Sequence, residues 1–256
     1  MKVGIVGCGA IGSEVARAAS VMPGIRSVVL YDIDPDATAQ LKNLPRTRVA
    51  RSPKALLQAV DLVIEAANKG VVQTVVRDAL AAGKGAMLLT IGALADDALR
   101  EELVGLAKKH KGKIYLPSGA VMGVDGVKAA AESDLKSVTL VTTKPPAGVD
   151  RNKTDRWSLL FSGPAREAVQ RFPKNVNVAA TLSLAGLGFD GTHVQVAIDP
   201  MATRNSHKVI IEGSFGRARI EVENLPSPTN PATSYLASLS AIALLRRIVS
   251  PIEIGA

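Results

Sequence analysis

A glycine-rich segment near the amino terminus is the first place where residue types and spacing suggest chemistry. Gly7, Gly9 and Gly12 form a GxGxxG pattern between a short apolar run and an amphipathic helical pattern. In such a loop the first glycine makes a tight turn, the second lets the backbone approach a pyrophosphate, and the third lets the helix pack on the strand. The helix that opens with Ala10 and Ile11 attracts the phosphates through its amino terminus. The pattern predicts a dinucleotide site, and the alternative is a glycine turn in an α/β protein that binds no cofactor.

Asp32 sharpens this prediction because it ends the next strand-like run, about 20 residues after Gly12. A carboxylate at this place accepts hydrogen bonds from the adenosine ribose hydroxyls and repels a 2′-phosphate. Ile33 follows it, where an arginine would help to bind that phosphate. We therefore expect NAD as the cofactor, with NADP as the alternative. Asn68, after the fourth expected strand, is expected either to contact the cofactor or to cap the following helix.

Three histidines are available for proton transfer, a task that suits a side chain whose usual pKa lies near neutrality. His110 falls in a lysine-rich helix end and His193 begins an alternating strand, so local structure explains both. His207 follows a polar segment that we expect to be a loop between strands, where functional residues are often carried. His207 is therefore the candidate catalytic residue, and the alternative is an ordinary histidine at a loop or strand edge.

The composition of the 256-residue chain excludes several classes of protein. Apolar residues make up 47% and charged residues 21%, which allows a sizeable core and rules out a wholly disordered chain. The formal charge of +8 permits anionic partners, but aromatic residues are only 3%, which argues against a base-stacking nucleic-acid surface. The single cysteine, Cys8, excludes an internal disulfide and a multi-cysteine metal site, so we expect no metal.

The sequence also lacks membrane and export signals. No segment reaches the roughly 18 uninterrupted apolar residues that are needed to span a bilayer. The amino terminus enters a strand-like run directly, without the succession of a signal peptide. We expect a soluble cytoplasmic protein with neither a membrane nor a nucleic acid as partner.

Short apolar runs alternate with helical patterns in the first half of the chain, which is typical of a doubly wound parallel sheet. The strands expected there are 2–6, 28–31, 48–50, 62–65, 85–89 and 113–116, with helices at 71–82 and 95–110. The alternation ends near residue 118. After it we expect strands at 137–143, 193–198, 208–212 and 218–222, a polar loop at 147–157, and helices at 165–171, 178–186 and 234–249.

Strands that follow one another in this second half indicate an α+β domain. We therefore predict an α/β protein with an N-terminal Rossmann-type doubly wound parallel sheet and a second α+β domain. The first domain is expected to comprise residues 1–118 and the closing segment 231–256, and the second domain residues 119–230.

Several stretches taken together resemble the L-aspartate dehydrogenase family, nearly from end to end of the chain. The most specific are FPKNVNVAA at 172–180 and the NSH triplet at 205–207. The other stretches are the glycine loop, 91–94, 116–120, 144–146, 182–186, 199–200, 224–227 and 230–234.

This resemblance implies an NAD(P)-dependent oxidoreductase that deaminates L-aspartate oxidatively or runs the reverse amination. Iminoaspartate forms first, and either hydrolyses to oxaloacetate and ammonia or passes towards quinolinate and NAD biosynthesis. The resemblance also implies a homodimer whose α+β domain carries substrate contacts and forms the dimer. By position in the shared motifs, His207 corresponds to the catalytic histidine, and Ala120 and Asn177 to contacts on the nicotinamide side of the cofactor.

A substrate with two carboxylates requires cationic or amide donors. Arg204 and Lys174 are the preferred candidates because they neighbour the two most specific motifs, and Asn205 adds an amide. Any one of these cations is more simply explained as a surface charge. The further cations in or beside the shared motifs are Lys144 and Lys208.

Other functions stay open as alternatives. A two-domain reductase of the dihydrodipicolinate-reductase type shares the architecture, but its His-His pair and its Lys-x-Asp-Ala-Pro-Ser-Gly-Thr stretch are absent from the sequence. A sugar-type oxidoreductase would carry Glu-Lys-Pro after the fifth strand, where this chain has Leu89-Thr90-Ile91-Gly92. A non-catalytic NAD-sensing regulator that binds DNA would require a local basic patch, whereas the lysines and arginines are spread along the chain.

Overall fold

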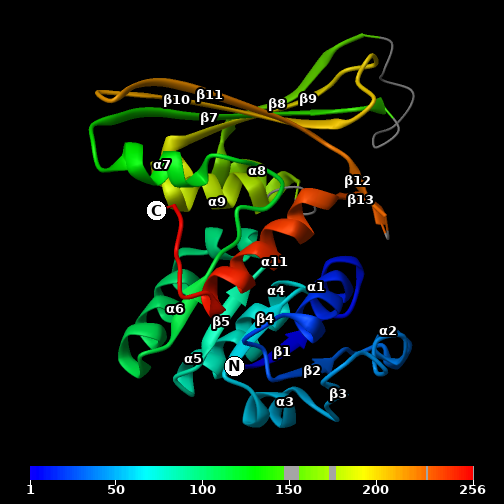
Figure 1. Ribbon diagram of the computed structural model, residues 1–256. Helices are drawn as coiled ribbons and strands as arrows, with labels where there is room; N and C mark the ends of the chain where they lie inside the picture. Colours follow the sequence, from blue (N-terminus) through cyan, green and yellow to red (C-terminus); the bar gives the residue numbers. More distant parts are fainter. Residues whose placement is uncertain (147–155, 173–176, 229, 256) are drawn as a thin grey trace. The chain divides into compact units, whose positions relative to one another are not determined.

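The structure is a computed structural model that describes residues 1–146, 156–172, 177–228 and 230–255 (Figure 1). The described residues form two compact units. The first unit is Met1–Pro117 together with Ser238–Ile254, and the second is Ser118–Ala237 together with Gly255. Each unit has a sheet and helices of its own.

The first unit is built on a parallel sheet. Its strands are β1 (Lys2–Val6), β2 (Ser27–Tyr31), β3 (Thr47–Val49), β4 (Leu62–Glu65), β5 (Gly85–Leu88) and β6 (Lys113–Tyr115). They lie in the order β3-β2-β1-β4-β5-β6. Every residue of β4 is buried, because helices cover both faces of a doubly wound sheet and its central strands must be apolar on both sides. The strands expected in this half are confirmed to within one residue at each end.

Helices flank both faces of this sheet (Figure 1). They are α1 (Ala10–Val21), α2 (Pro35–Ala39), α3 (Pro53–Ala59), α4 (Lys69–Val71), the π-helical turn η1 (Val72–Val76), α5 (Arg77–Ala81), the 3-10 turn η2 (Ile91–Ala95), α6 (Asp97–His110) and most of α11 (Tyr235–Val249). Because α4, η1 and α5 follow one another without a break, they form one continuous helix.

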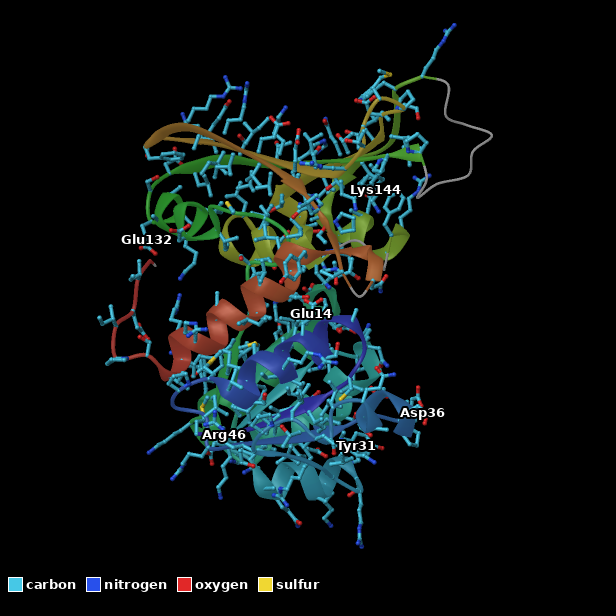
Figure 2. The ribbon with its side chains drawn as sticks, turned by 45° about the vertical axis from the view of Figure 1, so that its right-hand side comes forward. Glu14, Tyr31, Asp36, Arg46, Glu132 and Lys144 are labelled. Carbon is cyan, nitrogen blue, oxygen red and sulfur yellow. The ribbon has the colours of Figure 1, made fainter. Side chains whose placement is uncertain are left out.

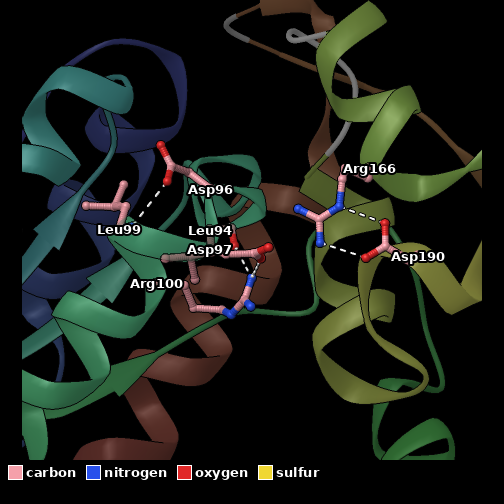
Figure 3. A network of polar contacts seen from close by, with 7 residues as sticks. All are labelled: Leu94, Asp96, Asp97, Leu99, Arg100, Arg166 and Asp190. Carbon is pink, nitrogen blue, oxygen red and sulfur yellow. Dashed lines mark hydrogen bonds and ion pairs between the residues drawn. The ribbon is translucent and has the colours of Figure 1, made fainter.

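Helix α6 begins at Asp97 because Asp96 caps it. The Asp96 carboxylate accepts a hydrogen bond of 3.2 Å from the backbone N–H of Leu99, as N-cap residues do (Figure 3). Arg100 reinforces this first turn with an ion pair of 2.6 Å to Asp97 and a hydrogen bond of 2.9 Å to the carbonyl of Leu94 (Figure 3). The helix therefore starts two residues later than its apolar pattern suggests.

The closing helix α11 completes the core of the first unit. Ala241 and Leu245 are fully buried in one hydrophobic cluster with Val15 and Ala19 of α1 and Ile5 of β1. Apolar residues four positions apart lie on one face of a helix, so α11 presents a single stripe to this core. The core of the first unit thus depends on residues from both ends of the chain.

The second unit is built on a mixed sheet covered by helices on one face (Figure 1). Its strands are β7 (Leu135–Lys144), β8 (Ser158–Pro164), β9 (Thr192–Ile198), β10 (Asn205–Gly213) and β11 (Gly216–Asn224), with a small ladder of β12 (Pro226–Ser227) and β13 (Asn230–Ser234). Its helices are α7 (Val124–Ala131), α8 (Ala165–Arg171), α9 (Asn177–Ala185) and α10 (Gly188–Gly191). The sheet order is β11-β10-β7-β9-β8, and only the β7–β9 pairing within it is parallel. Buried residues alternate along β10, as expected for a sheet with one covered face.

A bidentate ion pair joins two of the helices of this unit. The guanidinium of Arg166 on α8 donates to both carboxylate oxygens of Asp190 on α10, at 2.7 and 2.8 Å (Figure 3). The same guanidinium lies 5.8 Å from the centre of the Phe189 ring. Two parallel hydrogen bonds hold the pair in one geometry, so its role is to fix α10 against α8.

The structure corrects two expectations about the second unit. Helix α7 and strand β8 are absent from the predicted elements, because α7 consists largely of small residues and β8 lacks an alternating apolar pattern. Strand β10 starts at Asn205, so the expectation that His207 lies in a loop is wrong. Pairing with β11 from Asn205 onwards extends the strand beyond its apolar part. Most of the expected loop at 147–157 lies outside the described residues.

Truncation of a core residue of α11 tests its role in the first unit. Leu245→Ala removes a fully buried side chain, so we expect the free energy of unfolding to fall by about 3 kcal/mol. Leu239→Ala, on the same helix but 40% exposed, is the matched control and is expected to cost less than about 1 kcal/mol. Urea unfolding followed by circular dichroism measures both, and equal losses would contradict the described packing of α11.

Candidate active site

The glycine loop of the first unit has the shape that a pyrophosphate requires. Gly7 has a φ of +95°, and a Cβ on it would lie 2.5 Å from the carbonyl oxygen of Ala66. A Cβ on Gly12 would lie 1.9 Å from the carbonyl oxygen of Gly7, so only glycine allows helix α1 to pack this closely. At Gly9 an added Cβ would meet no atom within 4 Å. Protein packing therefore explains Gly7 and Gly12, whereas the open space at Gly9 leaves room for a ligand.

The amino terminus of α1 is open towards such a ligand. Gly9 is the N-cap residue of this helix, and no side chain caps its first turn, where Ala10 and Ile11 lie. The first N–H groups of a helix have no partner within the helix and bind phosphate oxygens readily. The residues of the loop therefore fit the pyrophosphate of a dinucleotide.

Asp32 lies directly beside this loop. Its carboxylate accepts hydrogen bonds from the backbone N–H groups of Cys8, at 2.5 Å, and Asp34, at 2.9 Å. These bonds orient the carboxylate at the end of β2 and leave lone pairs for ribose hydroxyls. Burial, and secondly the negative charge of Asp32, raise the pKa of the Cys8 thiol to about 12. Cys8 is consequently a packing residue of the loop, since reactive cysteines require a thiolate.

A buried carboxylate that the sequence analysis missed organises the end of β4. Glu65 is fully buried, and it accepts hydrogen bonds from the Thr90 N–H at 3.0 Å, the Thr90 hydroxyl at 2.7 Å and the Ala67 N–H at 2.8 Å. Burial raises the pKa of this carboxyl group, while its hydrogen bonds act in the opposite direction. Glu65 therefore ties the turn after β4 to the turn after β5. An acidic residue at the end of an otherwise apolar strand is the signal that could have identified it.

Asn68 lies in the turn after β4, which the hydrogen bonds of Glu65 stabilise. Its side-chain oxygen accepts hydrogen bonds from the N–H groups of Gly70, at 2.9 Å, and Val71, at 3.2 Å. Asn68 is thus the N-cap of α4, which confirms the capping role considered for it. Its second expected role, a contact with the cofactor, stays a prediction.

His207 is buried on the helix-covered face of the second sheet. It is 7% exposed, and its Nδ1 lies 3.0 Å from the hydroxyl of Thr142, the residue paired with it on β7. Burial, and secondly the positive charge of Lys144, lower the pKa of His207 to about 4. The imidazole is therefore neutral at neutral pH, and its Nε2 has no hydrogen bond to any residue that the structure describes. The neutral ring therefore presents Nε2 as a lone-pair acceptor for a hydrogen bond or a proton from a ligand.

Ala120 and Asn177, expected on the nicotinamide side, are both in the second unit. Ala120 is buried, and its carbonyl accepts a hydrogen bond of 3.0 Å from the side-chain amide of Asn224. Asn177 is exposed and begins α9. Asn224 is itself buried and belongs to one of the motifs quoted above, but the sequence analysis gave it no role. It fixes the backbone of Ala120 in place.

The expected substrate-binding residues have different surroundings. Arg204 is half exposed and lies 4.0 Å from Glu223, while Asn205 begins β10 opposite Asn224. Lys174 lies outside the described residues. Arg204 thus already faces a carboxylate of the protein itself.

Two kinds of structure are absent from the part of the chain that the structure describes. No helix among them has both the length and the apolarity to cross a bilayer. No group of three or more histidine, cysteine, aspartate or glutamate side chains in the same residues could hold a metal ion.

Known protein families match both parts of the chain. A family model described as the NAD binding domain of homoserine dehydrogenase matches residues 7–117, and one described as the C-terminal part of aspartate dehydrogenase matches residues 125–248. Curated relatives align over the whole length. The L-aspartate dehydrogenase of Methanosarcina acetivorans is 46% identical over 100% of this chain and 99% of its own. That of Methanothermobacter thermautotrophicus is 41% identical over 100% of this chain and 98% of its own.

Solved structures resemble the chain in the same way. The crystal structure of aspartate dehydrogenase from Thermotoga maritima has a TM-score of 0.83 and 27% identity, covering 100% of this chain and 99% of that chain. Scyllo-inositol dehydrogenase from Lactobacillus casei has a TM-score of 0.61 at 16% identity, which shows a shared fold alone. The expected fold class, a Rossmann-type sheet followed by an α+β domain, is confirmed.

The buried, neutral state of His207 predicts a pH dependence of stability. Because its pKa is lowered from 6.5 to about 4, the unfolded chain takes up the proton first as the pH falls. The contribution of the neutral imidazole to the free energy of unfolding is complete above pH 6.5. It falls by about 3 kcal/mol in total as the pH is lowered to 4. Urea unfolding of the wild type and of His207→Gln at several pH values measures it. We expect the difference between their unfolding free energies to change by that amount, and parallel curves would contradict the burial of a neutral imidazole.

Proposed function

The chain belongs to the L-aspartate dehydrogenase family, and we propose on this premise that it catalyses NAD(P)-dependent oxidative deamination of L-aspartate with His207 as its catalytic residue. The observation that carries the role of His207 is its buried imidazole, bonded to Thr142 through Nδ1 and free of described partners at Nε2. The reaction removes a hydride from the α-carbon and a proton from the amino nitrogen, which leaves iminoaspartate. Water then releases oxaloacetate and ammonia, and the reverse sequence is a reductive amination.

The first unit supplies the groups that hold the cofactor. The open backbone at Gly9 and the uncapped start of α1 bind the pyrophosphate, and Asp32 accepts hydrogen bonds from the adenosine ribose. When it is bound, NAD(P) supplies the acceptor for the hydride. The carboxylate of Asp32 disfavours a 2′-phosphate, so NAD is preferred over NADP.

His207 handles protons at the substrate. A neutral imidazole accepts the proton that the amino group must lose before the hydride can depart. Once it has released this proton to solvent, the same group, neutral again, activates the water that attacks the imine carbon. Thr142 holds the ring through Nδ1, which directs Nε2 to the substrate in both steps. The carboxylates of the substrate are bound by Arg204, Asn205 and Lys174.

The roles of the two domains, the further cofactor contacts and the cellular role are inferred from the L-aspartate dehydrogenase family. Residues 1–118 with 231–256 bind the cofactor, while residues 119–230 bind the substrate and form a homodimer. Ala120, held by Asn224, and Asn177 contact the nicotinamide side, as does Asn68. The enzyme acts in the cytoplasm and supplies NAD biosynthesis, and it has no nucleic-acid partner.

The choice of cofactor is tested at Asp32. Asp32→Ala removes the acceptor for the ribose hydroxyls and the charge that repels a 2′-phosphate, so we expect the ratio of kcat/KM for NAD over NADP to fall by about 10-fold or more. Steady-state kinetics with each cofactor give this ratio. The neighbouring carboxylate variant Asp36→Ala, on the exposed helix α2, serves as control. An unchanged ratio in Asp32→Ala would refute the assignment.

Catalysis is tested at His207. His207→Gln keeps a polar side chain of similar size but cannot act as the base, so we expect kcat to fall by about 100-fold or more while the KM for NAD stays unchanged. The absorbance of reduced cofactor is followed with L-aspartate, and separately with oxaloacetate plus ammonia. Wild-type protein without activity in either direction would overturn the proposed function. Full activity of His207→Gln would overturn only the role of His207.

A further inference from the structure

Lys144 is the last residue of β7, and its position on that strand points its side chain towards the helix layer (Figure 2). Leu140 and Thr142 precede it at intervals of two residues and are both buried. Because side chains alternate along a strand, Lys144 continues the same face. The side chain of Lys144 therefore lies on the same face of β7 as that of Thr142, whose hydroxyl is hydrogen-bonded to His207.

Lys144 also lines a pocket within the second unit. The pocket is lined by Thr142 and Lys144, and otherwise by Phe172 and apolar side chains of β7, β9, α8 and α9. Lys144 is the one charged side chain in this set, and Thr142 is the one other polar side chain. The pocket is small, and its apolar walls and single cation suit one methylene group that ends in an anion.

The ammonium of Lys144 has no counter-charge among the described residues. By contrast, Lys208 on the neighbouring strand pairs with Glu221 at 3.1 Å, and Arg204 lies 4.0 Å from Glu223. Burial lowers the pKa of Lys144, and its positive charge contributes to the lowered pKa of His207. A half-buried cation that lacks an anion is costly to maintain in a folded protein, which points to a ligand that supplies the anion.

We propose that Lys144 binds the side-chain carboxylate of the substrate and thereby makes the site specific for an amino acid with an acidic side chain. This inference rests on the proposed function. The apolar walls receive the methylene group, and the ammonium pairs with the carboxylate at its end. The same contact places the substrate beside Thr142, the hydrogen-bond partner of His207.

Lys144→Met tests the proposal because it keeps the length of the side chain and removes its charge. We expect the KM for L-aspartate to rise by about 30-fold or more, with kcat within a few fold of the wild type. L-Asparagine, which has an amide in place of the side-chain carboxylate, serves as a competitive inhibitor of matched size. Its inhibition constant is expected to stay unchanged in Lys144→Met, so the preference for aspartate over asparagine collapses.

Two further variants act as controls. Lys136→Met makes the same substitution at the other, exposed end of β7 and is expected to leave every constant unchanged. Lys144→Arg keeps the positive charge and is expected to retain most of the affinity for aspartate. The melting temperature of Lys144→Met is expected to equal or exceed that of the wild type, since the variant removes a cation that has no described partner.

The outcomes separate this proposal from the assignment of His207. An unchanged KM for aspartate in Lys144→Met would overturn the proposal. An equal loss of aspartate and asparagine binding would also overturn it, because Lys144 would then bind the α-carboxylate, which both ligands share. Calorimetric binding of L-aspartate to His207→Gln in the presence of the reduced cofactor NADH, with which L-aspartate does not react, is expected to match the wild type. Failure of the His207 prediction would leave these binding results intact.

Discussion

The burial of the His207 imidazole is the constraint on which the proposed chemistry of this protein depends. An imidazole that is 7% exposed on the covered face of a sheet loses most of its interaction with water, so the neutral form is favoured. The hydroxyl of Thr142 forms a hydrogen bond with Nδ1 of the ring, and Nε2 is left for a ligand. The position of β10 between β7 and β11 is therefore as important to the proposed reaction as the histidine itself.

In the first unit, close packing sets the geometry of the candidate cofactor site. Helix α1 approaches the loop before it so closely that Gly12 admits no side chain, and the uncapped start of the helix lies at the open space around Gly9. Glu65 holds the turns after β4 and β5 together through hydrogen bonds to Thr90 and Ala67. A buried carboxylate is tolerated there because each of its oxygens has a donor.

Much of the first unit could be predicted from the sequence, whereas the second could be predicted only in part. Buried parallel strands are continuous apolar runs, so β1 to β6 and the place of Asp32 after β2 could be predicted directly. Strand β10 begins with polar residues, and its pairing partner β11 lies beyond a hairpin turn. Local apolar patterning does not report such pairing, which is why His207 was expected in a loop. Thr142 and Asn224 were missed for the same reason, since each acts through a residue distant in sequence.

The sequence by itself determined the class of fold, the dinucleotide loop and the family, because each is written in local patterns of apolar residues, glycines and short motifs. It also identified His207 as the histidine of interest, through a motif and not through its surroundings. Only the tertiary structure decided the state of that histidine, because burial and the field of Lys144 come from strands that are adjacent only after folding. It likewise distinguished Lys144 from Arg204 and Lys208, since a lysine or arginine in a sequence does not show whether a carboxylate will face it.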